Sequence, residues 1–336
     1  MKRKLRIFDY CWHIAHQWDM VQALKDDCEF FYCLNVKRQW DVSIRPLPPE
    51  IHFVTHYTPG AYDVAILHID QQVIETMHQK RMVYEQFNRC ITDIPRIVIN
   101  HGSPVNPEYV GTLFPQATEE WMQQYCIAEV KKILGGNTMV VNSHAAASAA
   151  ECGFGYPIVH GMSPDEWLDL PKEPRVFTAL SPGGLSAYYN RECMVKMSDI
   201  LYDKYGYVLC YAHLNVDVDQ TPEAYKTFLG SSLLYVDTSY RTPMNRSRTE
   251  AMLSGCCVVQ VAGAHDLDLW AQDGKNIVIV PDDPERIASV IASLLSSRYA
   301  EALEIGRCGK AMARLRFSRE RYRLDWLHLF QLLRLM

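Results

Sequence analysis

Short apolar runs alternate with amphipathic segments along the chain, and this alternation constrains the fold more than any other feature of the sequence. In the first half, runs typical of buried strands lie at residues 5–10, 29–35, 63–69, 96–100 and 139–142. Segments with a helical pattern lie between them, at residues 19–25, 73–90, 118–134 and 144–152. Because successive βα units build a parallel sheet covered by helices, we expect a doubly wound, Rossmann-like α/β domain here.

A second series of the same kind follows, with strand-like runs at residues 176–180, 207–211, 233–236, 257–261 and 277–280. The segment between the two series contains Gly161, Pro164, Pro171 and Pro174, which interrupt regular structure. A chain of 336 residues is also longer than a single core usually supports. We therefore expect two Rossmann-like domains that meet near residue 161 and face a central cleft, where the strands' carboxyl ends bind ligands.

The composition excludes several classes of protein. The net charge of −5 argues against nucleic-acid binding, which needs a concentrated basic surface. Eleven cysteines form no C-x-x-C pair, so we expect no metal centre and no cofactor. With no apolar stretch of signal-peptide or membrane-span length, the sequence predicts a cytoplasmic protein. Its two ends are basic, which fits either a solvated face or peripheral contact with the inner face of a membrane.

The stretch from residue 242 to residue 259 is typical of a loop, a short helix and a buried strand. Ser247 and Glu250 have the spacing of a capping box, and Gly255 follows where a helix would end. The free N–H groups at a helix start can bind a phosphate, and Arg246 and Arg248 would strengthen that binding.

This stretch resembles the retaining GT-B glycosyltransferases, a group that includes bacterial mannosyl- and glucosyltransferases. Their signature is a Glu-Ala-Met-x-x-Gly-x-x-Val-Val run, and the matching residues are Glu250, Ala251, Met252, Gly255, Val258 and Val259. The resemblance implies that Glu250 holds the ribose hydroxyls of a donor nucleotide. The alternative, from the residues alone, is that Glu250 only caps its helix.

Four further segments resemble the same family in the same order, at residues 140–147, 160–167, 274–288 and 317–321. The last opens a C-terminal helix which, in this fold, crosses back onto the first domain. The resemblance thus implies an N-terminal acceptor domain at residues 1–161 together with the helix 317–336. It places the nucleotide-sugar donor domain at residues 162–316.

The chain departs from the family pattern where the donor phosphates would bind. Thr242 takes the place of the first glutamate of the family's Glu-x7-Glu pair, so that residue's contacts do not carry over. A Pro-Gly-Gly loop with Gly183 and Gly184 replaces the family's Gly-Arg and Lys-Gly motif. Backbone N–H groups of such a loop can approach a phosphate, and Arg191 on the next helix is a candidate cation.

Two histidines are the catalytic candidates of the first domain. His101 follows the strand 96–100 and resembles the family's Thr-x-His histidine, which implies that it faces the transferred sugar. His13 lies in the segment 9–19, which we expect to be the first βα loop. A pair of His13 and Asp19 would be a general base for an inverting reaction, the alternative to a retaining one.

The expected function is transfer of a hexose-like sugar from a nucleoside diphosphate, UDP or GDP, to a hydroxyl acceptor. The resemblance implies a retaining, metal-independent reaction on a glycan, a glycolipid or a cell-surface polysaccharide. Two alternatives stay open: a nucleotide-sugar epimerase of the same fold, and a non-catalytic binding module.

Overall fold

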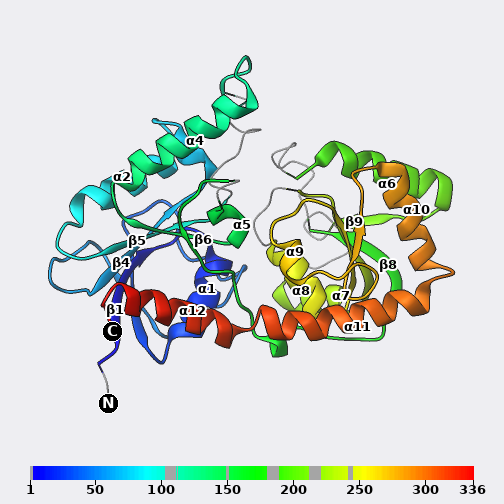
Figure 1. Cartoon of the computed structure of the whole chain (residues 1–336). Coiled ribbons are helices and arrows are strands. Elements are labelled where there is room, and N and C mark those ends of the chain that lie inside the picture. Colours follow the sequence, from blue (N-terminus) through cyan, green and yellow to red (C-terminus); the bar gives the residue numbers. More distant parts are fainter. Residues whose placement is uncertain are drawn as a thin grey trace. The chain divides into compact units, whose positions relative to one another are not determined.

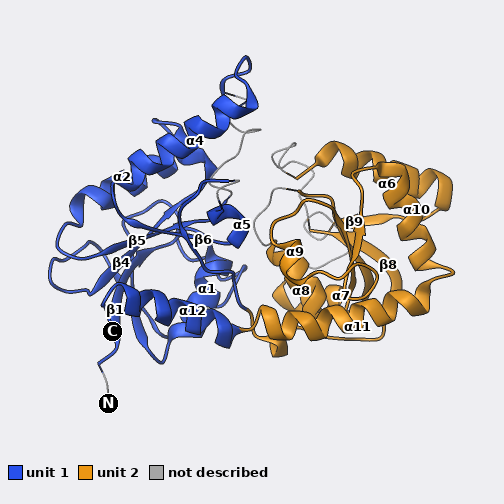
Figure 2. Cartoon of the chain, viewed as in Figure 1, with its two compact units in different colours: residues 1–161, 319–336 blue, residues 162–318 orange. Residues whose placement is uncertain are grey.

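The computed structural model describes residues 3–102, 111, 113–148, 151–179, 189–211, 221–240 and 245–336. The chain divides into two compact units (Figure 2). Unit 1 comprises Met1–Gly161 and Arg319–Met336, and unit 2 comprises Met162–Ser318. The last helix therefore belongs to the same unit as the first strand, although about 300 residues separate them in the sequence.

Unit 1 is built on a seven-stranded parallel sheet with the order β3-β2-β1-β4-β5-β6-β7 (Figure 1). Its strand order reverses between β1 and β4, and ligands of doubly wound sheets bind at such a switch point. The strands are β1 (Leu5–Tyr10), β2 (Cys28–Cys33), β3 (Ile51–Val54), β4 (Val64–Ile69), β5 (Arg96–Asn100), β6 (Thr138–Val141) and β7 (Tyr156–Pro157).

The helices of unit 1 cover this sheet and have recognisable start and stop signals. In the helix 119–134, the Thr118 side chain accepts a hydrogen bond from the backbone N–H of Trp121, and Gly135 ends the helix in a left-handed conformation. The helices are α1 (Ile14–Leu24), η1 (Gln71–Ile74), α2 (Gln79–Cys90), α4 (Glu119–Leu134), α5 (His144–Ala147) and α12 (Arg319–Leu332).

The C-terminal helix α12 packs against α1 and completes the core of unit 1. Trp326 and Phe330 are fully buried in a cluster with residues of β1 and β2. On the solvent side, Arg323 forms an ion pair with Asp27, the residue before β2. Apolar burial therefore holds this helix in place, and the partly exposed ion pair adds little.

Unit 2 has a five-stranded parallel sheet with the order β12-β11-β10-β8-β9. Here the strand order reverses between β8 and β10. The strands are β8 (Glu173–Thr178), β9 (Leu209–Tyr211), β10 (Ser232–Asp237), β11 (Cys257–Val261) and β12 (Val278–Val280). The helices are η2 (Pro164–Glu166), α6 (Arg191–Tyr205), α7 (Pro222–Ser231), α8 (Arg246–Leu253), α9 (Leu267–Trp270), α10 (Pro284–Leu295) and α11 (Tyr299–Arg316).

Close packing of backbone against backbone fixes α11 over the turn between α8 and β11. A Cβ atom at Gly306 of α11 would lie 2.3 Å from the carbonyl oxygen of Gly255, which real structures do not tolerate. Gly255 itself has a φ of 76°, which confirms the expected glycine stop after α8.

The expectation of two parallel α/β sheets is confirmed, and each expected strand overlaps an observed one. The loop expected at residues 9–19 is wrong in its second half, because α1 already begins at Ile14 and His13 is its N-cap. The buried residues Ile14, Gln17, Val21 and Leu24 follow a helical spacing, but the polar Gln17 hides that spacing in the sequence.

Candidate functional site

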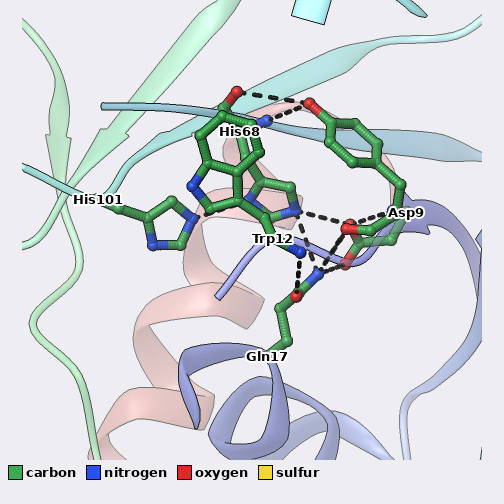
Figure 3. A network of polar contacts seen from close by, with 6 residues as sticks. Asp9, Trp12, Gln17, His68 and His101 are labelled. Carbon is green, nitrogen blue, oxygen red and sulfur yellow. Dashed lines mark hydrogen bonds and ion pairs between the residues drawn. The ribbon is translucent and has the colours of Figure 1, made fainter. Parts of the chain in front are cut away.

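A chain of three hydrogen-bonded side chains crosses the carboxyl edge of the sheet in unit 1 (Figure 3). Asp9 near the end of β1 contacts His68 near the end of β4, with 2.7 Å between Oδ1 and Nε2. The other ring nitrogen of His68 lies 2.9 Å from Nε2 of His101, the residue after β5. Because β1 and β4 flank the switch point, this Asp9–His68–His101 chain occupies the expected place for a ligand site.

Gln17 of α1 holds the buried end of this chain. Its side-chain oxygen accepts a hydrogen bond from the backbone N–H of Trp12 at 2.9 Å. Its amide nitrogen donates to the carbonyl of Tyr10 at 2.9 Å and to both carboxylate oxygens of Asp9 at 3.1 and 3.2 Å. The two backbone partners fix the orientation of the amide, so Asp9 receives donors and remains an acceptor.

Aromatic and imidazole rings surround the outer end of the chain. Trp12 lies parallel to His101, with ring centroids 6.3 Å apart, and Lys80 lies 5.4 Å from the Trp12 ring. The rings of His13 and His16 lie 5.7 and 5.3 Å from that of His101. Figure 3 shows Trp12 beside His68 and His101. Four histidine rings and one tryptophan ring thus gather around one strand end.

The surroundings of His101 favour its neutral form. Burial lowers the pKa of His101 well below the usual 6.5, and a positive charge on His68, His13 or Lys80 lowers it further whenever that group is protonated. His101 is therefore neutral at physiological pH.

His101 also lines a narrow pocket that has room for about one water molecule. The pocket lies between the sheet, α1 and α12. Its walls are His16, Gln17, Met20, Ile99, His101, Val140, Asn142, Ile158, His160, Tyr322 and Trp326.

In unit 2, the end of β10 is tied to the start of α8. The side-chain oxygen of Asn245 accepts from the backbone N–H of Ser247 at 3.0 Å, and its nitrogen donates to Asp237 at 2.9 Å. The expected capping box of Ser247 and Glu250 is therefore wrong, since Asn245 is the N-cap and Ser247 lies inside the helix. The Asn245 side chain reaches the N–H two residues on, which is equally good cap geometry.

Glu250 lies on α8 and is only 5% exposed. One carboxylate oxygen is 3.2 Å from Arg246, and the other accepts a hydrogen bond from the Tyr225 hydroxyl at 2.9 Å. Both partners hold the carboxylate in a defined orientation. Burial raises the pKa of Tyr225 well above its usual value, and the negative charge of Glu250 raises it further.

Arg248 is fully buried and belongs to the interior of unit 2. Its guanidinium donates to Gln260 at 2.8 Å and lies 5.2 Å from the Trp270 ring. Burial raises the pKa of Asp237, and the positive charge of Arg248 opposes that rise. Arg248 thus stabilises the charged end of β10.

Comparisons with known proteins agree with this architecture. No family model matches the sequence, and no curated protein is similar to it in sequence. Among solved structures, HepE of Anabaena in complex with UDP and glucose has a TM-score of 0.66 at 13% identity, over 97% of this chain and 99% of that one. Sucrose-phosphate synthase of Thermosynechococcus elongatus has a TM-score of 0.68 at 14% identity, over 98% and 99%. Trehalose-6-phosphate synthase, OtsA, has a TM-score of 0.61 at 11% identity, over 98% and 99%.

The chain has the GT-B fold. Both sheets match the two α/β domains of that fold, as expected. In GT-B terms, the Asp9–His68–His101 chain lies at the switch point of the N-terminal domain, and Asp237 and Asn245 lie at that of the C-terminal domain.

The structure brings some of the predicted GT-B site residues together and leaves others apart. Arg246 and Glu250 are in contact, and Arg191 is exposed at the first position of α6. His13 is the N-cap of α1 and Asp19 is buried within that helix, and their pairing as a general base stays a prediction. Gly183, Gly184 and Thr242 lie outside the described residues, so their donor contacts stay predictions.

Sequence reasoning missed Asp9, His68 and Gln17 as parts of the site. One signal was present, because His68 interrupts the otherwise apolar run Val64–Ile69, in which every residue is buried. A buried polar ring in such a strand needs hydrogen-bond partners. The sequence alone did not show that Asp9 would be one of the partners of His68.

Neither a metal cluster nor a membrane span is found in the part of the chain that the structure describes. Within it, no three His, Cys, Asp or Glu side chains form a group that could hold a metal ion. None of its helices is both long and apolar enough to cross a bilayer.

Replacing Asn245 with alanine is expected to destabilise unit 2 by about 2 kcal/mol, since it removes both a helix cap and a partner of the buried Asp237. Urea unfolding of this variant should be compared with that of Thr118→Ala. The Thr118 variant removes an ordinary cap, for about 1 kcal/mol. Equal losses in the two variants would mean that the contact with Asp237 contributes nothing.

Proposed function

We propose that this protein is a glycosyltransferase that moves a hexose-like sugar from a nucleoside diphosphate sugar to a hydroxyl acceptor. The observation that carries the proposal is the GT-B fold along nearly the whole chain. HepE, one of the similar structures, was solved in complexes with UDP and with UDP-glucose. UDP-glucose is therefore the first donor to test, with GDP sugars beside it.

The donor nucleotide would bind to unit 2 at the start of α8. Glu250 is oriented by Arg246 and Tyr225, and its carboxylate would accept hydrogen bonds from the two ribose hydroxyls. The N–H groups at the start of the eight-residue helix α8 would face the diphosphate, with Arg246 as a cation beside it. The predicted contacts of Ser247, Arg191, Thr242, Gly183 and Gly184 belong to the same proposal, whereas the predicted phosphate contact of Arg248 is dropped because its guanidinium is fully buried against Gln260.

The proposed reaction is retaining and independent of a metal ion. Fixed cations and helix N–H groups would stabilise the leaving diphosphate, and the leaving phosphate would take the proton of the acceptor hydroxyl. His101 would contact the transferred sugar from unit 1. The inverting alternative would use His13, the N-cap of α1, as the base with Asp19 as its partner.

The acceptor in this proposal is a glycan, a glycolipid or a cell-surface polysaccharide, glycosylated on the cytoplasmic side. All eleven cysteines lie among the described residues and are free thiols, which is typical of a reducing compartment. The proposal includes peripheral contact of the basic ends with a membrane surface. Arg3 already pairs with Asp63, and Arg323 with Asp27, so these charges are partly neutralised.

Turnover of the donor tests the proposal. We expect the protein, in buffer with EDTA, to release UDP or GDP from one member of a panel of nucleotide sugars. The released sugar or glycoside should keep the donor's anomeric configuration when it is followed by NMR. An inverted anomer would exclude the retaining reaction, and a rearranged but still nucleotide-linked sugar would indicate an epimerase. Donor binding without any turnover would indicate a non-catalytic module.

A further inference from the structure

The hydrogen bonds in the Asp9–His68–His101 chain determine where the protons lie. Asp9 receives donors from Gln17 and from the backbone N–H of Tyr10, so it is an acceptor toward His68. At 2.7 Å from that carboxylate, Nε2 of His68 must carry the proton. In a singly protonated His68 ring, Nδ1 then has a lone pair.

The same reasoning extends to the next ring. Nδ1 of His68 lies 2.9 Å from Nε2 of His101, so His101 must donate its Nε2 proton. The remaining nitrogen of His101, Nδ1, then carries a lone pair. The buried carboxylate thus determines the tautomer of a ring two steps away.

The His101 Nδ1 atom is buried and has no hydrogen-bond partner among the described residues. Figure 3 shows this nitrogen on the side of the ring that faces away from His68. His101 lines the narrow pocket, which has room for about one water molecule and hence for one hydroxyl group. A buried acceptor without a partner is costly, so a donor of that size is expected to occupy it in the working protein.

We propose that Asp9 and His68 are positioning residues that hold His101 in the Nε2–H tautomer, so that its Nδ1 accepts a hydrogen bond from one hydroxyl group of the bound sugar. This inference rests on the proposed function. The proposed role involves no proton transfer. The site would discriminate between sugars, because a sugar without that hydroxyl leaves the buried Nδ1 of His101 without a hydrogen-bond donor.

The first test reads the tautomers without any substrate. In the full chain labelled with ¹⁵N-histidine, long-range ¹H–¹⁵N spectra should show His68 and His101 as neutral Nε2–H tautomers between pH 6 and 8. His68→Gln and His101→Gln assign the two sets of signals. A His101 ring with its proton on Nδ1, or a charged ring at pH 7, would overturn the proposal, whether or not the protein turns over nucleotide sugars.

The second test identifies the hydroxyl group by comparing kcat/KM for the active donor with kcat/KM for each of its deoxy analogues. For one analogue, wild-type kcat/KM should fall about tenfold, the worth of one hydrogen bond. Asp9→Asn removes the charge but keeps a similar shape, and it should largely abolish the difference between that analogue and the full donor. Asp63→Asn, which alters a partly buried carboxylate that pairs with Arg3 in the same unit, should keep the tenfold difference.

A tenfold difference that persists in Asp9→Asn would overturn the role of the carboxylate. If no deoxy analogue differs from the donor, the pocket holds only a water molecule and the proposal fails. If Asp9→Asn does not fold, the tautomers of the wild-type protein still decide, because they need no variant of Asp9.

Discussion

Glu250→Ala is expected to weaken binding of the nucleotide-sugar donor about 100-fold. The proposed site lets this carboxylate accept hydrogen bonds from two ribose hydroxyls, and each bond to a charged group contributes about 1.5–3 kcal/mol. At 1.4 kcal/mol for each factor of ten, the loss of both corresponds to a factor of 100 or more. Titration calorimetry with UDP and with the intact donor measures it.

Two further variants separate the ribose contact from general damage to α8. Glu304→Ala removes an exposed acidic partner of Arg307 on α11, and it should leave donor affinity unchanged. Glu250→Gln keeps the size of the side chain and one acceptor, so its loss should be intermediate. Unchanged affinity in Glu250→Ala would show that Glu250 serves only its contacts with Arg246 and Tyr225.

Trp326→Ala is expected to destabilise unit 1 by about 3–5 kcal/mol, the usual cost of deleting a fully buried tryptophan. The ring packs against Tyr322 and Phe330 of the same helix and belongs to the core beneath β1 and β2. Hydrogen exchange followed by mass spectrometry should show faster exchange in β1, β2 and α1. The strands β10 and β11 of unit 2 should keep their protection.

Leu324 supplies the control for that variant, because it lies on the same helix but is 53% exposed. Leu324→Ala should change stability by less than about 0.5 kcal/mol. If Trp326→Ala accelerated hydrogen exchange in unit 2 as strongly as in unit 1, the assignment of α12 to the core of unit 1 would be wrong.

The strands were predictable because burial on both faces of a parallel sheet leaves a visible apolar run. β1, β5 and β11 have the same bounds as the runs expected from the sequence. By contrast, β3 lies on an edge of its sheet, and two of its four residues are exposed. Its pattern is therefore ambiguous, and the sequence did not separate it from a loop.

From the sequence, a site residue was predictable only where its own type and its place after a strand indicate a role. His101 stands directly after a buried strand, which places it at a sheet edge. The partnership of Asp9 and His68 depends on β1 and β4 being neighbours in the sheet, although 59 residues separate the two in the sequence. Strand order is a tertiary property, and no local spacing in the sequence records it.

The start of α8 shows the same limit on a smaller scale. Ser247 and Asn245 are both good capping residues, and a Glu three residues after Ser247 favoured the wrong one. Asn245 is selected by Asp237 at the end of β10, which accepts its amide nitrogen. Packing of two elements therefore moved the helix start by two residues.

The polar residues of both candidate sites lie at the points where the strand order of each sheet reverses. In unit 1, Asp9 and His68 lie on the two strands that flank the reversal. In unit 2, Asp237 ends β10, one of the two strands that flank the other reversal. Loops and helix starts diverge from each sheet at these points, which leaves space for a ligand.

A thermal-shift screen against nucleoside diphosphates and their sugars tests the central claim most directly, since it needs neither an acceptor nor turnover. A donor present at about 100 times its dissociation constant stabilises the protein by about 2.7 kcal/mol, which raises the melting temperature by several degrees. We predict such a shift for a UDP or GDP sugar in the wild-type protein, and a much smaller one in Glu250→Ala at the same concentration. No shift with any nucleotide sugar at millimolar concentration would contradict the account.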